Sequence, residues 1–185
     1  MSKNIVLVRF SSRNCGNCAA ISEYITEYYA ENKVNSYVVD DNIVQACNDC
    51  DYECLQPGKI CPNRNEKHTE LMDAICNADL VYFIVPNYCG LPSANYFVFN
   101  ERSVGYFNMD RALMQKYMQV PKRFIVVSNT EGSNFINTLS QQVVGEPEIL
   151  YMKTGKYHKR SIAGDMLEAT EAKADLQAFL TKDSL

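Results

Sequence analysis

Short apolar runs alternate along the chain with segments in which apolar residues recur at helical spacing. The apolar runs have the length and β-branched content of buried strands and cover residues 5–10, 34–39, 80–85, 124–127 and 149–152. The helical pattern covers residues 18–31, 66–77 and about 165–182. Pro86 is expected to end the third strand, because proline has no amide hydrogen to give to a sheet.

This alternation predicts a parallel sheet, because parallel neighbours need crossover connections and these are usually helical. We therefore expect one domain over residues 1–185, an α/β doubly wound sandwich with a five-stranded parallel sheet and helices on both faces. In such folds ligands bind beyond the carboxyl ends of the strands, near the point where the strand order reverses. The loops that begin at residues 11, 86 and 128 are the candidates.

Composition narrows the class of partner. The 185 residues are 46% hydrophobic and 22% charged, with a formal net charge of -4, which favours neither disorder nor a nucleic-acid partner. No apolar run approaches the roughly 20 residues that span a bilayer, and the first residues do not resemble a signal peptide. We expect a cytoplasmic protein whose partners are small molecules or proteins, with no membrane contact.

The stretch "SSRNCGNC", residues 11–18, falls between the first strand and the first helix. A helix N-terminus offers free amides and a favourable dipole to a phosphate, and Ser11, Ser12 and Gly16 suit that use. A redox dithiol formed by Cys15 and Cys18 needs nearly the same position, because the dipole acidifies one thiol. The Ser-Ser-Arg run favours phosphate, and the dithiol stays open as an alternative.

Residues 41–63 form a cysteine-rich loop without apolar periodicity. Cys47, Cys50, Cys54 and Cys61 are spaced Cys-x2-Cys-x3-Cys-x6-Cys, and four thiolates on a short loop can bind a [4Fe-4S] cluster or one zinc ion. The compact spacing and the Pro62 that follows the last cysteine favour iron-sulfur over zinc. Zinc and free thiols remain the alternatives. The only histidines, His68 and His158, lack ligand partners nearby in the sequence and are expected at the surface or at helix ends.

Two segments carry a resemblance to a known family. "SSRNCGNC" resembles the Gly-Ser-Pro-Arg-x-x-Gly-Asn-Thr loop of the flavodoxin-like NAD(P)H-dependent FMN reductases, which include the iron-sulfur flavoproteins. "PNYCGLPSANYFVFNER", residues 86–102, resembles their Pro-x-Tyr-x-Gly-x-x-Ser-Ala segment ending in Phe-x-Asp-Arg. The iron-sulfur flavoproteins also carry a compact four-cysteine motif at this place, usually with x2 where this chain has x3.

The resemblance implies a site for FMN at the carboxyl ends of the strands. The residues expected around the phosphate are Ser11, Ser12, Arg13, Gly16, Asn17 and Cys18. The residues expected along the isoalloxazine ring are Pro86, Asn87, Tyr88, Cys89 and Gly90, with Ser128, Glu131 and Gly132 closing the other side. The chain departs from the family at Cys18, where the family has Thr or Ser, and at Ser12, where it has Pro. A thiol is a weaker hydrogen-bond donor to phosphate than a hydroxyl.

These expectations combine into an FMN-dependent oxidoreductase with a [4Fe-4S] cluster next to the flavin. No side chain is expected to act as a catalytic acid or base, because the flavin carries the redox chemistry. NAD(P)H or ferredoxin are the expected electron partners, and a homo-oligomer is expected. The alternatives are a thiol-disulfide oxidoreductase that uses Cys15 and Cys18, or a flavodoxin-like binding module in which zinc stabilises the cysteine loop.

Overall fold

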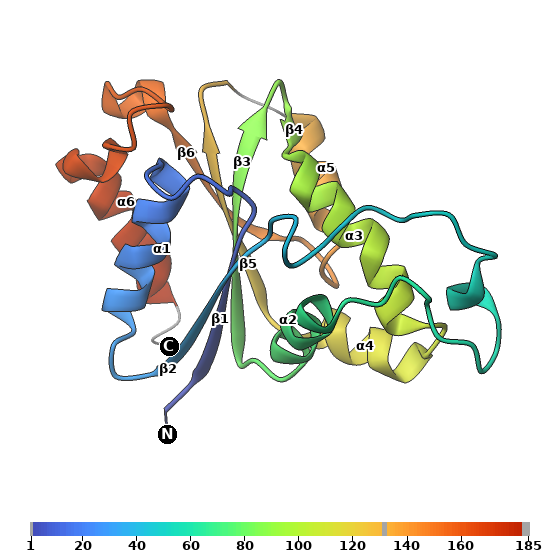
Figure 1. Ribbon diagram of the computed structural model, residues 1–185. Helices are drawn as coiled ribbons and strands as arrows, with labels where there is room; N and C mark the ends of the chain where they lie inside the picture. Colours follow the sequence, from blue (N-terminus) through green and yellow to red (C-terminus); the bar gives the residue numbers. More distant parts are fainter. Residues whose placement is uncertain (1, 131–132, 183–185) are drawn as a thin grey trace.

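The computed structural model describes residues 2–130 and 133–182, and a parallel β-sheet forms its centre (Figure 1). Five strands pair in parallel in the order β2-β1-β3-β5-β6. Their bounds are β1 (Asn4–Arg9), β2 (Lys33–Val38), β3 (Leu80–Tyr88), β5 (Lys122–Ser128) and β6 (Glu148–Lys153). The two-residue strand β4 (Leu91–Pro92) pairs antiparallel with the end of β3. The predicted doubly wound fold with five parallel strands is confirmed.

Helices cover both faces of the sheet (Figure 1). One face carries α1 (Asn17–Tyr28) and α6 (Thr170–Thr181). The other face carries α2 (Glu66–Cys76), α3 (Ala94–Phe107), α4 (Arg111–Gln119) and α5 (Ser133–Ser140). Three short 3-10 helices lie in connections, namely η1 (Glu53–Leu55), η2 (Thr154–Tyr157) and η3 (Met166–Glu168). None of the helices described is both long and apolar enough to span a bilayer.

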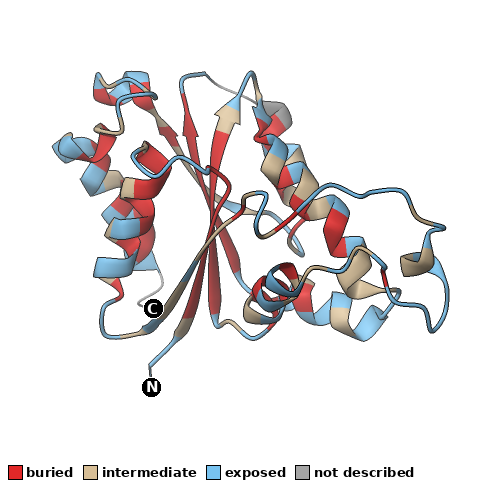
Figure 2. Cartoon of the chain, viewed as in Figure 1, coloured by how far each residue is buried: buried red, intermediate tan, exposed pale blue. Residues whose placement is uncertain are grey.

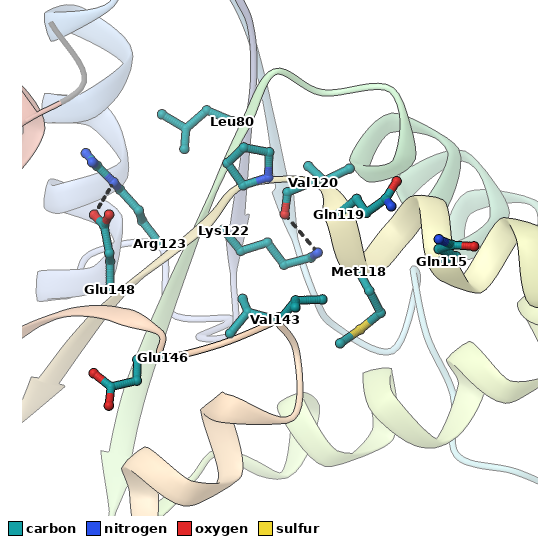
Figure 3. A pocket seen from close by; sticks show the side chains of 12 residues that line it. Leu80, Gln115, Met118, Gln119, Val120, Lys122, Arg123, Val143, Glu146 and Glu148 are labelled. Atoms are coloured by element: carbon teal, nitrogen blue, oxygen red, sulfur yellow. Dashed lines mark hydrogen bonds and ion pairs between the residues drawn. The ribbon is translucent and has the colours of Figure 1, made fainter. Parts of the chain in front are cut away.

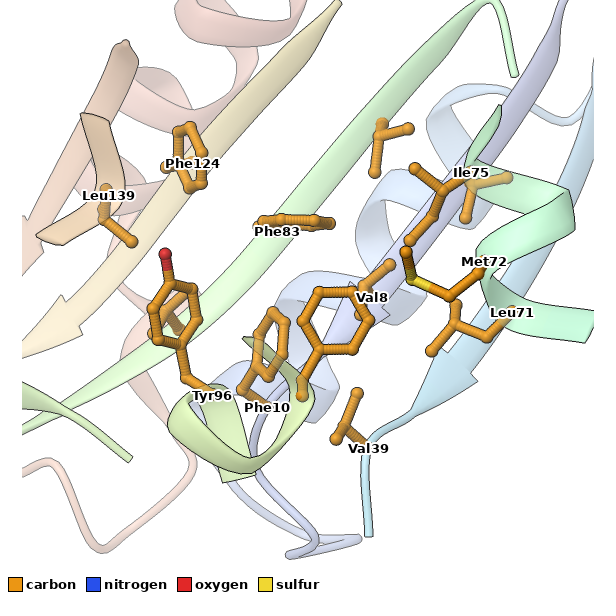
Figure 4. Packing of buried hydrophobic residues seen from close by; sticks show 14 of the residues in the cluster. Val8, Phe10, Val39, Leu71, Met72, Ile75, Phe83, Tyr96, Phe124 and Leu139 are labelled. Atoms are coloured by element: carbon orange, nitrogen blue, oxygen red, sulfur yellow. The ribbon is translucent and has the colours of Figure 1, made fainter. Parts of the chain in front are cut away.

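The central strands are buried because each face packs against helices (Figure 2). Successive side chains of a strand point to opposite faces, so Val6 and Val8 join the core under α2 to α5, whereas Ile5 and Leu7 join the core under α1 and α6. Phe10 continues the first of these cores and meets the rings of Phe83, Tyr96 and Phe99 edge to face at centroid distances of 5.2–5.5 Å (Figure 4). Burial of each such side chain contributes about 1.5–3 kcal/mol.

Two expectations about the elements were wrong. Strand β3 continues past Pro86 to Tyr88. Its pairing with β1 ends at Ile84, so Pro86 has a paired neighbour on one side only, Val127 of β5, and a proline is tolerated there. The last helix begins at Thr170, and the residues before it form the short 3-10 helix η3. The sequence pattern had not predicted α3, α4 or α5. The cysteine-rich loop is irregular as expected and projects beside α3 (Figure 1).

Candidate functional site

The sheet has its switch point between β1 and β3, where successive connections turn to opposite faces. A ligand site is expected there, outside the carboxyl ends of the strands. Side chains tie the loops at this edge to one another. Ser93 donates its hydroxyl to the Phe10 carbonyl at 2.8 Å, and Asn87 Nδ2 donates to Ser128 Oγ at 2.8 Å. The structure thus brings the predicted loops after β1, β3 and β5 together.

The loop after β1 ends in a helix N-terminus that no side chain caps. Gly16 occupies the N-cap position with extended backbone, and the first turn of α1 holds no acidic residue. The first amides of a helix have no partner within it and favour an anion. Ser12 and Arg13 are exposed, Ser11 is buried, and the Arg13 carbonyl accepts a hydrogen bond from Arg9 Nη1. This end of α1 can receive a phosphate.

Asn17 has a structural role that the sequence did not indicate. Its buried side chain donates to the Ser161 carbonyl at 3.2 Å and accepts from the Met166 amide at 3.0 Å. Gly164 belongs to the same segment, with φ at +74°, and a Cβ there would lie only 2.6 Å from the Cys15 carbonyl oxygen. The side chain of Asn17 therefore ties the segment 160–166 to the first loop.

Cys18 lies within the core rather than at the surface. It is 5% exposed and packs in the cluster that includes Ile5 and Leu7. Burial raises the pKa of its thiol to about 12, against the opposing charges of Arg9 and Arg13. A reactive dithiol needs an acidified, accessible thiol. Cys18 therefore cannot serve as that accessible thiol, whereas Cys15 is exposed.

The turn after β3 is held by the side chain of Asn87. Its Nδ2 donates to Ser128 Oγ and, at 2.9 Å, to the Tyr151 hydroxyl, while its Oδ1 accepts from the Gly90 amide at 2.9 Å. Cys89 and Gly90 both have positive φ, at +53° and +84°, and glycine adopts this conformation without strain. The turn leaves Tyr88 48% exposed beside the sheet edge. A fixed turn with an accessible aromatic ring suits a planar ligand.

The loop after β5 is tied to its neighbours by a second set of hydrogen bonds. Ser128 Oγ accepts from the Thr130 amide at 3.0 Å, and the Tyr151 hydroxyl donates to the Thr130 carbonyl at 2.8 Å. Asn129 donates to Ser161 Oγ at 2.8 Å and accepts from Thr154 Oγ1 at 2.6 Å. No sequence pattern had indicated that Thr154 or Ser161 contact this loop. The expected site residues Glu131 and Gly132 lie outside the described residues.

Two of the four cysteines of the loop contact one buried arginine of α3. Arg102 is 6% exposed and donates from its two Nη atoms to Cys47 Sγ at 3.4 Å and Cys61 Sγ at 3.6 Å. Burial lowers the pKa of Arg102, but the hydrogen bonds and charges of these two thiols outweigh it, so the pKa is raised. Burial, followed by the charges of Cys61, Cys50 and Cys47, raises the pKa of Cys54. The four sulfur atoms therefore lie within electrostatic range of one another.

Gly105 makes room for one of these cysteines. A Cβ at this position of α3 would lie 3.3 Å from both Cβ and Sγ of Cys61. Among the residues that the structure describes, no three His, Cys, Asp or Glu side chains are arranged to hold a single metal ion. The iron-sulfur cluster stays a prediction.

A cavity of about 640 Å³ lies at the amino ends of the strands, opposite the loops described above (Figure 3). Lys122 lines it and is 5% exposed. Its ammonium group donates to the carbonyls of Tyr117 and Val120 and lies 4.1 Å from the centroid of the Tyr117 ring. These contacts satisfy the last carbonyls of α4, and burial lowers the pKa of Lys122 to about 8. The side chain thus has a structural role in ending that helix.

Comparison with known proteins identifies the fold. No protein-family model and no curated sequence matches the chain. Among solved structures it is similar to the Trp repressor binding protein from Bacillus subtilis, with TM-score 0.66, 14% identity, and 95% of this chain and 99% of that chain covered. A candidate quinone reductase from Klebsiella pneumoniae gives TM-score 0.65 at 15% identity over 97% of this chain and 85% of that one.

A third similar structure is FerB from Paracoccus denitrificans, a flavoenzyme NAD(P)H:(acceptor) oxidoreductase. It gives TM-score 0.59 at 15% identity, with 96% of this chain and 95% of that chain covered. The fold is flavodoxin-like. At these identities the likeness establishes the fold. The flavodoxin-like strand order places the switch point between β1 and β3, where the loops that follow these two strands meet.

Proposed function

We propose that the chain is an FMN-dependent oxidoreductase that takes electrons from NAD(P)H. The observation that supports this most directly is the Asn87 side chain, which fixes the turn after β3 against Ser128 and Tyr151 at the switch point. This turn adjoins the uncapped N-terminus of α1 across the same sheet edge. Similarity in fold to FerB, named as an NAD(P)H-dependent flavoenzyme, agrees with this proposal.

The phosphate would bind at the loop after β1. The exposed guanidinium of Arg13 and the hydroxyl of Ser12 supply charge and a donor, and the amides of Gly16, Asn17 and Cys18 complete the cradle. The Cys18 thiol is buried and packs in the core. Compared with the Thr or Ser of the resembling family, Cys18 would therefore give the phosphate one hydrogen-bond donor fewer.

The ring would lie along the turn after β3. Tyr88 offers its exposed ring for stacking, and the backbone of Cys89 and Gly90 can approach closely because Gly90 has no side chain. Ser128, Glu131 and Gly132 are proposed to close the opposite side. When bound, FMN supplies the hydride and electron transfer chemistry. The residues of the chain bind and orient it, and none is needed as an acid or base.

Titration of the chain with FMN under anaerobic conditions tests the proposal. We expect quenching of flavin fluorescence with saturation, followed by bleaching of flavin absorption on addition of NADH or NADPH. Arg13→Gln should weaken binding by about tenfold, because a charge-assisted hydrogen bond is worth about 1.5–3 kcal/mol. Lys67→Gln, a change of the same charge at an exposed position on α2, is the matched control. Unchanged flavin fluorescence at every protein concentration would overturn the proposal.

We also propose that Cys47, Cys50, Cys54 and Cys61 bind a [4Fe-4S] cluster. The buried Arg102 supports this, since its guanidinium needs anionic partners and its sulfur contacts are two of the four cysteines. Helix α3 begins at Ala94, shortly after the turn that would hold the flavin, and carries Arg102 roughly 12 Å further along its axis. One helix therefore links the two proposed cofactor sites, and ferredoxin or another electron carrier could exchange electrons at the loop.

Anaerobic reconstitution with iron and sulfide tests the cluster. We expect about four irons per chain and broad visible absorption, the content of one cubane. Cys54→Ser should lose most of the iron, whereas Cys15→Ser, a change at an exposed cysteine outside the loop, should retain it. One zinc and no iron per chain would select the zinc-stabilised alternative instead. Sedimentation of the reconstituted chain tests the expected homo-oligomer.

A further inference from the structure

A second cavity lies between the cysteine loop, the start of α2 and the middle of α3. Its volume is about 420 Å³. Its lining consists of Val44, Gln45, Ala46, Cys47, Asn48, Asn63, Arg64, Asn65, His68 and Arg102. Two of these side chains are cationic, four are amides and none is a carboxylate. The carboxylate of Glu101 accepts a hydrogen bond from the Cys47 amide at 3.1 Å, but Glu101 does not line the cavity.

Two nitrogen atoms on the lining residues are buried without a partner. His68 is 5% exposed, and its Nε2 has no hydrogen-bond partner among the described residues. Asn63 Nδ2 is also buried without one. Leaving a buried donor unpaired costs about 1–3 kcal/mol, so such groups in a native structure indicate a missing acceptor.

The position of His68 is fixed by its surroundings. Its amide donates to the side chain of Asn65, which caps α2, and its ring meets the Phe99 ring at a centroid distance of 5.9 Å. The residue therefore belongs to the first turn of α2, whose dipole adds positive potential to the cavity wall. Arg102 contributes the guanidinium that also contacts Cys47 and Cys61.

We propose that this cavity binds a small organic molecule through an oxyanion group, a carboxylate or a phosphate ester, with His68, Asn63, Arg64 and Arg102 as the donors. A cavity of about 420 Å³ is larger than an inorganic ion requires and matches the lower range of sites for small molecules. The proposal does not depend on the flavin, because none of these residues belongs to the loops after β1, β3 or β5.

Nuclear magnetic resonance of the histidine imidazoles tests the proposal directly, since the chain has two histidines. In separate arms, the full chain is titrated at neutral pH and constant ionic strength with inorganic phosphate and with malonate. We expect saturable shifts of the His68 imidazole resonances in at least one arm. The resonances of the exposed His158 should stay in place. If only phosphate shifts the His68 resonances, the ligand class is a phosphate ester. If only malonate shifts them, the ligand class is a carboxylate.

Two variants connect the response to the cavity. Asn63→Asp replaces a donor by a carboxylate of the same shape and should weaken binding by about tenfold or more. Arg64→Gln changes an exposed lining residue, so it leaves folding intact and should weaken binding by about threefold to tenfold. Asn137→Asp, an exposed site on α5, is the charge-matched control.

The proposed phosphate loop after β1 gives a separate outcome. Arg13→Gln should leave the His68 response unchanged, even where it weakens FMN binding. A His68 resonance that does not move in either arm would overturn the inference, as would binding in both the Asn63→Asp and the Arg64→Gln variant that is as strong as in the wild type. Failure of the chain to bind FMN would not affect either result.

Discussion

Arg102 donates to the thiol of Cys61 across 3.6 Å, from the middle of α3 to the last cysteine of the loop. The same guanidinium contacts Cys47 and the carbonyl of Asn63, so one buried side chain holds both ends of the cysteine cluster. We expect Arg102→Gln to lower the free energy of unfolding by about 2–3 kcal/mol, because three acceptors lose a charged donor. Urea denaturation measures the difference.

Arg111→Gln is the matched control for this variant. Arg111 is exposed at the start of α4, and its replacement should change stability by no more than about 0.5 kcal/mol. Equal stabilities of the Arg102→Gln and Arg111→Gln variants would contradict the role of Arg102.

Gly105 allows a prediction about the position of Cys61. Alanine in a helix interior is more favourable than glycine by about 1 kcal/mol. Its Cβ would contact Cys61 at 3.3 Å, so the cysteine must shift. Gly105→Ala should therefore raise the free energy of unfolding, measured by urea denaturation, by less than about 1 kcal/mol. The same variant should bind less iron on reconstitution. Val104→Ala, at an exposed neighbour on α3, should bind iron as the wild type does. Full iron content in Gly105→Ala would argue against Cys61 as a ligand.

Asn87 is predicted to control flavin affinity through the turn after β3. Asn87→Ala removes the donors to Ser128 and Tyr151 and the acceptor of the Gly90 amide, so the turn loses its fixed geometry. We expect FMN binding about tenfold weaker, measured by fluorescence titration. Tyr151→Phe removes one hydroxyl from the same set and should have a smaller effect in the same direction. An Asn87→Ala variant that binds FMN normally would exclude this role.

Strands β1, β3 and β5 could be predicted because each contains a short apolar run that the sheet buries on both faces, whereas the edge strands β2 and β6 are only half-buried. Helix α3 could not, since its residues include many aromatic and β-branched side chains, which are weak helix formers. Packing of Tyr96 and Phe99 against Phe10 stabilises it instead. Phe97, which lies between Tyr96 and Phe99 in the chain, is 42% exposed, so its side chain is not part of this buried cluster.

Topology predicts which loops form the candidate site, because the carboxyl ends of parallel strands meet at one edge of the sheet. Topology does not predict the contacts between individual side chains. Arg102 and Cys47 are 55 residues apart in the chain, and no local pattern indicates that they touch. His68 was expected at the surface or at a helix end. It lies in the first turn of α2 but is buried against Phe99 of α3, a helix that the sequence pattern had not predicted.

Thiol reactivity distinguishes the two cysteines of the first loop. Cys18 is buried with a pKa raised to about 12, whereas Cys15 is exposed. Because the thiolate is the nucleophile, iodoacetamide at mildly alkaline pH should alkylate Cys15 at least about tenfold faster than Cys18. Peptide mapping by mass spectrometry of the native chain measures both rates. Equal rates would contradict the burial of Cys18, and unfolding in urea should make Cys18 reactive.

His68 predicts a specific dependence of stability on pH. Burial, with a smaller contribution from the charge of Arg102, lowers the pKa of its imidazole from 6.5 to about 4. Between these values the unfolded chain binds a proton that the folded chain does not, so the free energy of unfolding falls as pH decreases from 6.5 to about 4. Above 6.5 the imidazole is neutral in both states and contributes no slope. Cys47, Arg64 and Arg102 are the titratable or charged groups that share its cavity.

Comparison with a variant isolates this contribution from the carboxylates that titrate in the same range. Urea denaturation of the wild type and of His68→Gln, at several pH values from 4 to 7, should show a loss in the wild type that exceeds the loss in the variant by up to about 3 kcal/mol. His158→Gln changes an exposed imidazole and should follow the wild type. If both variants and the wild type lose stability equally, the His68 imidazole has the same pKa in the folded and the unfolded chain. In that case the imidazole that lines the cavity beside the cysteine loop becomes a cation below about pH 6.5.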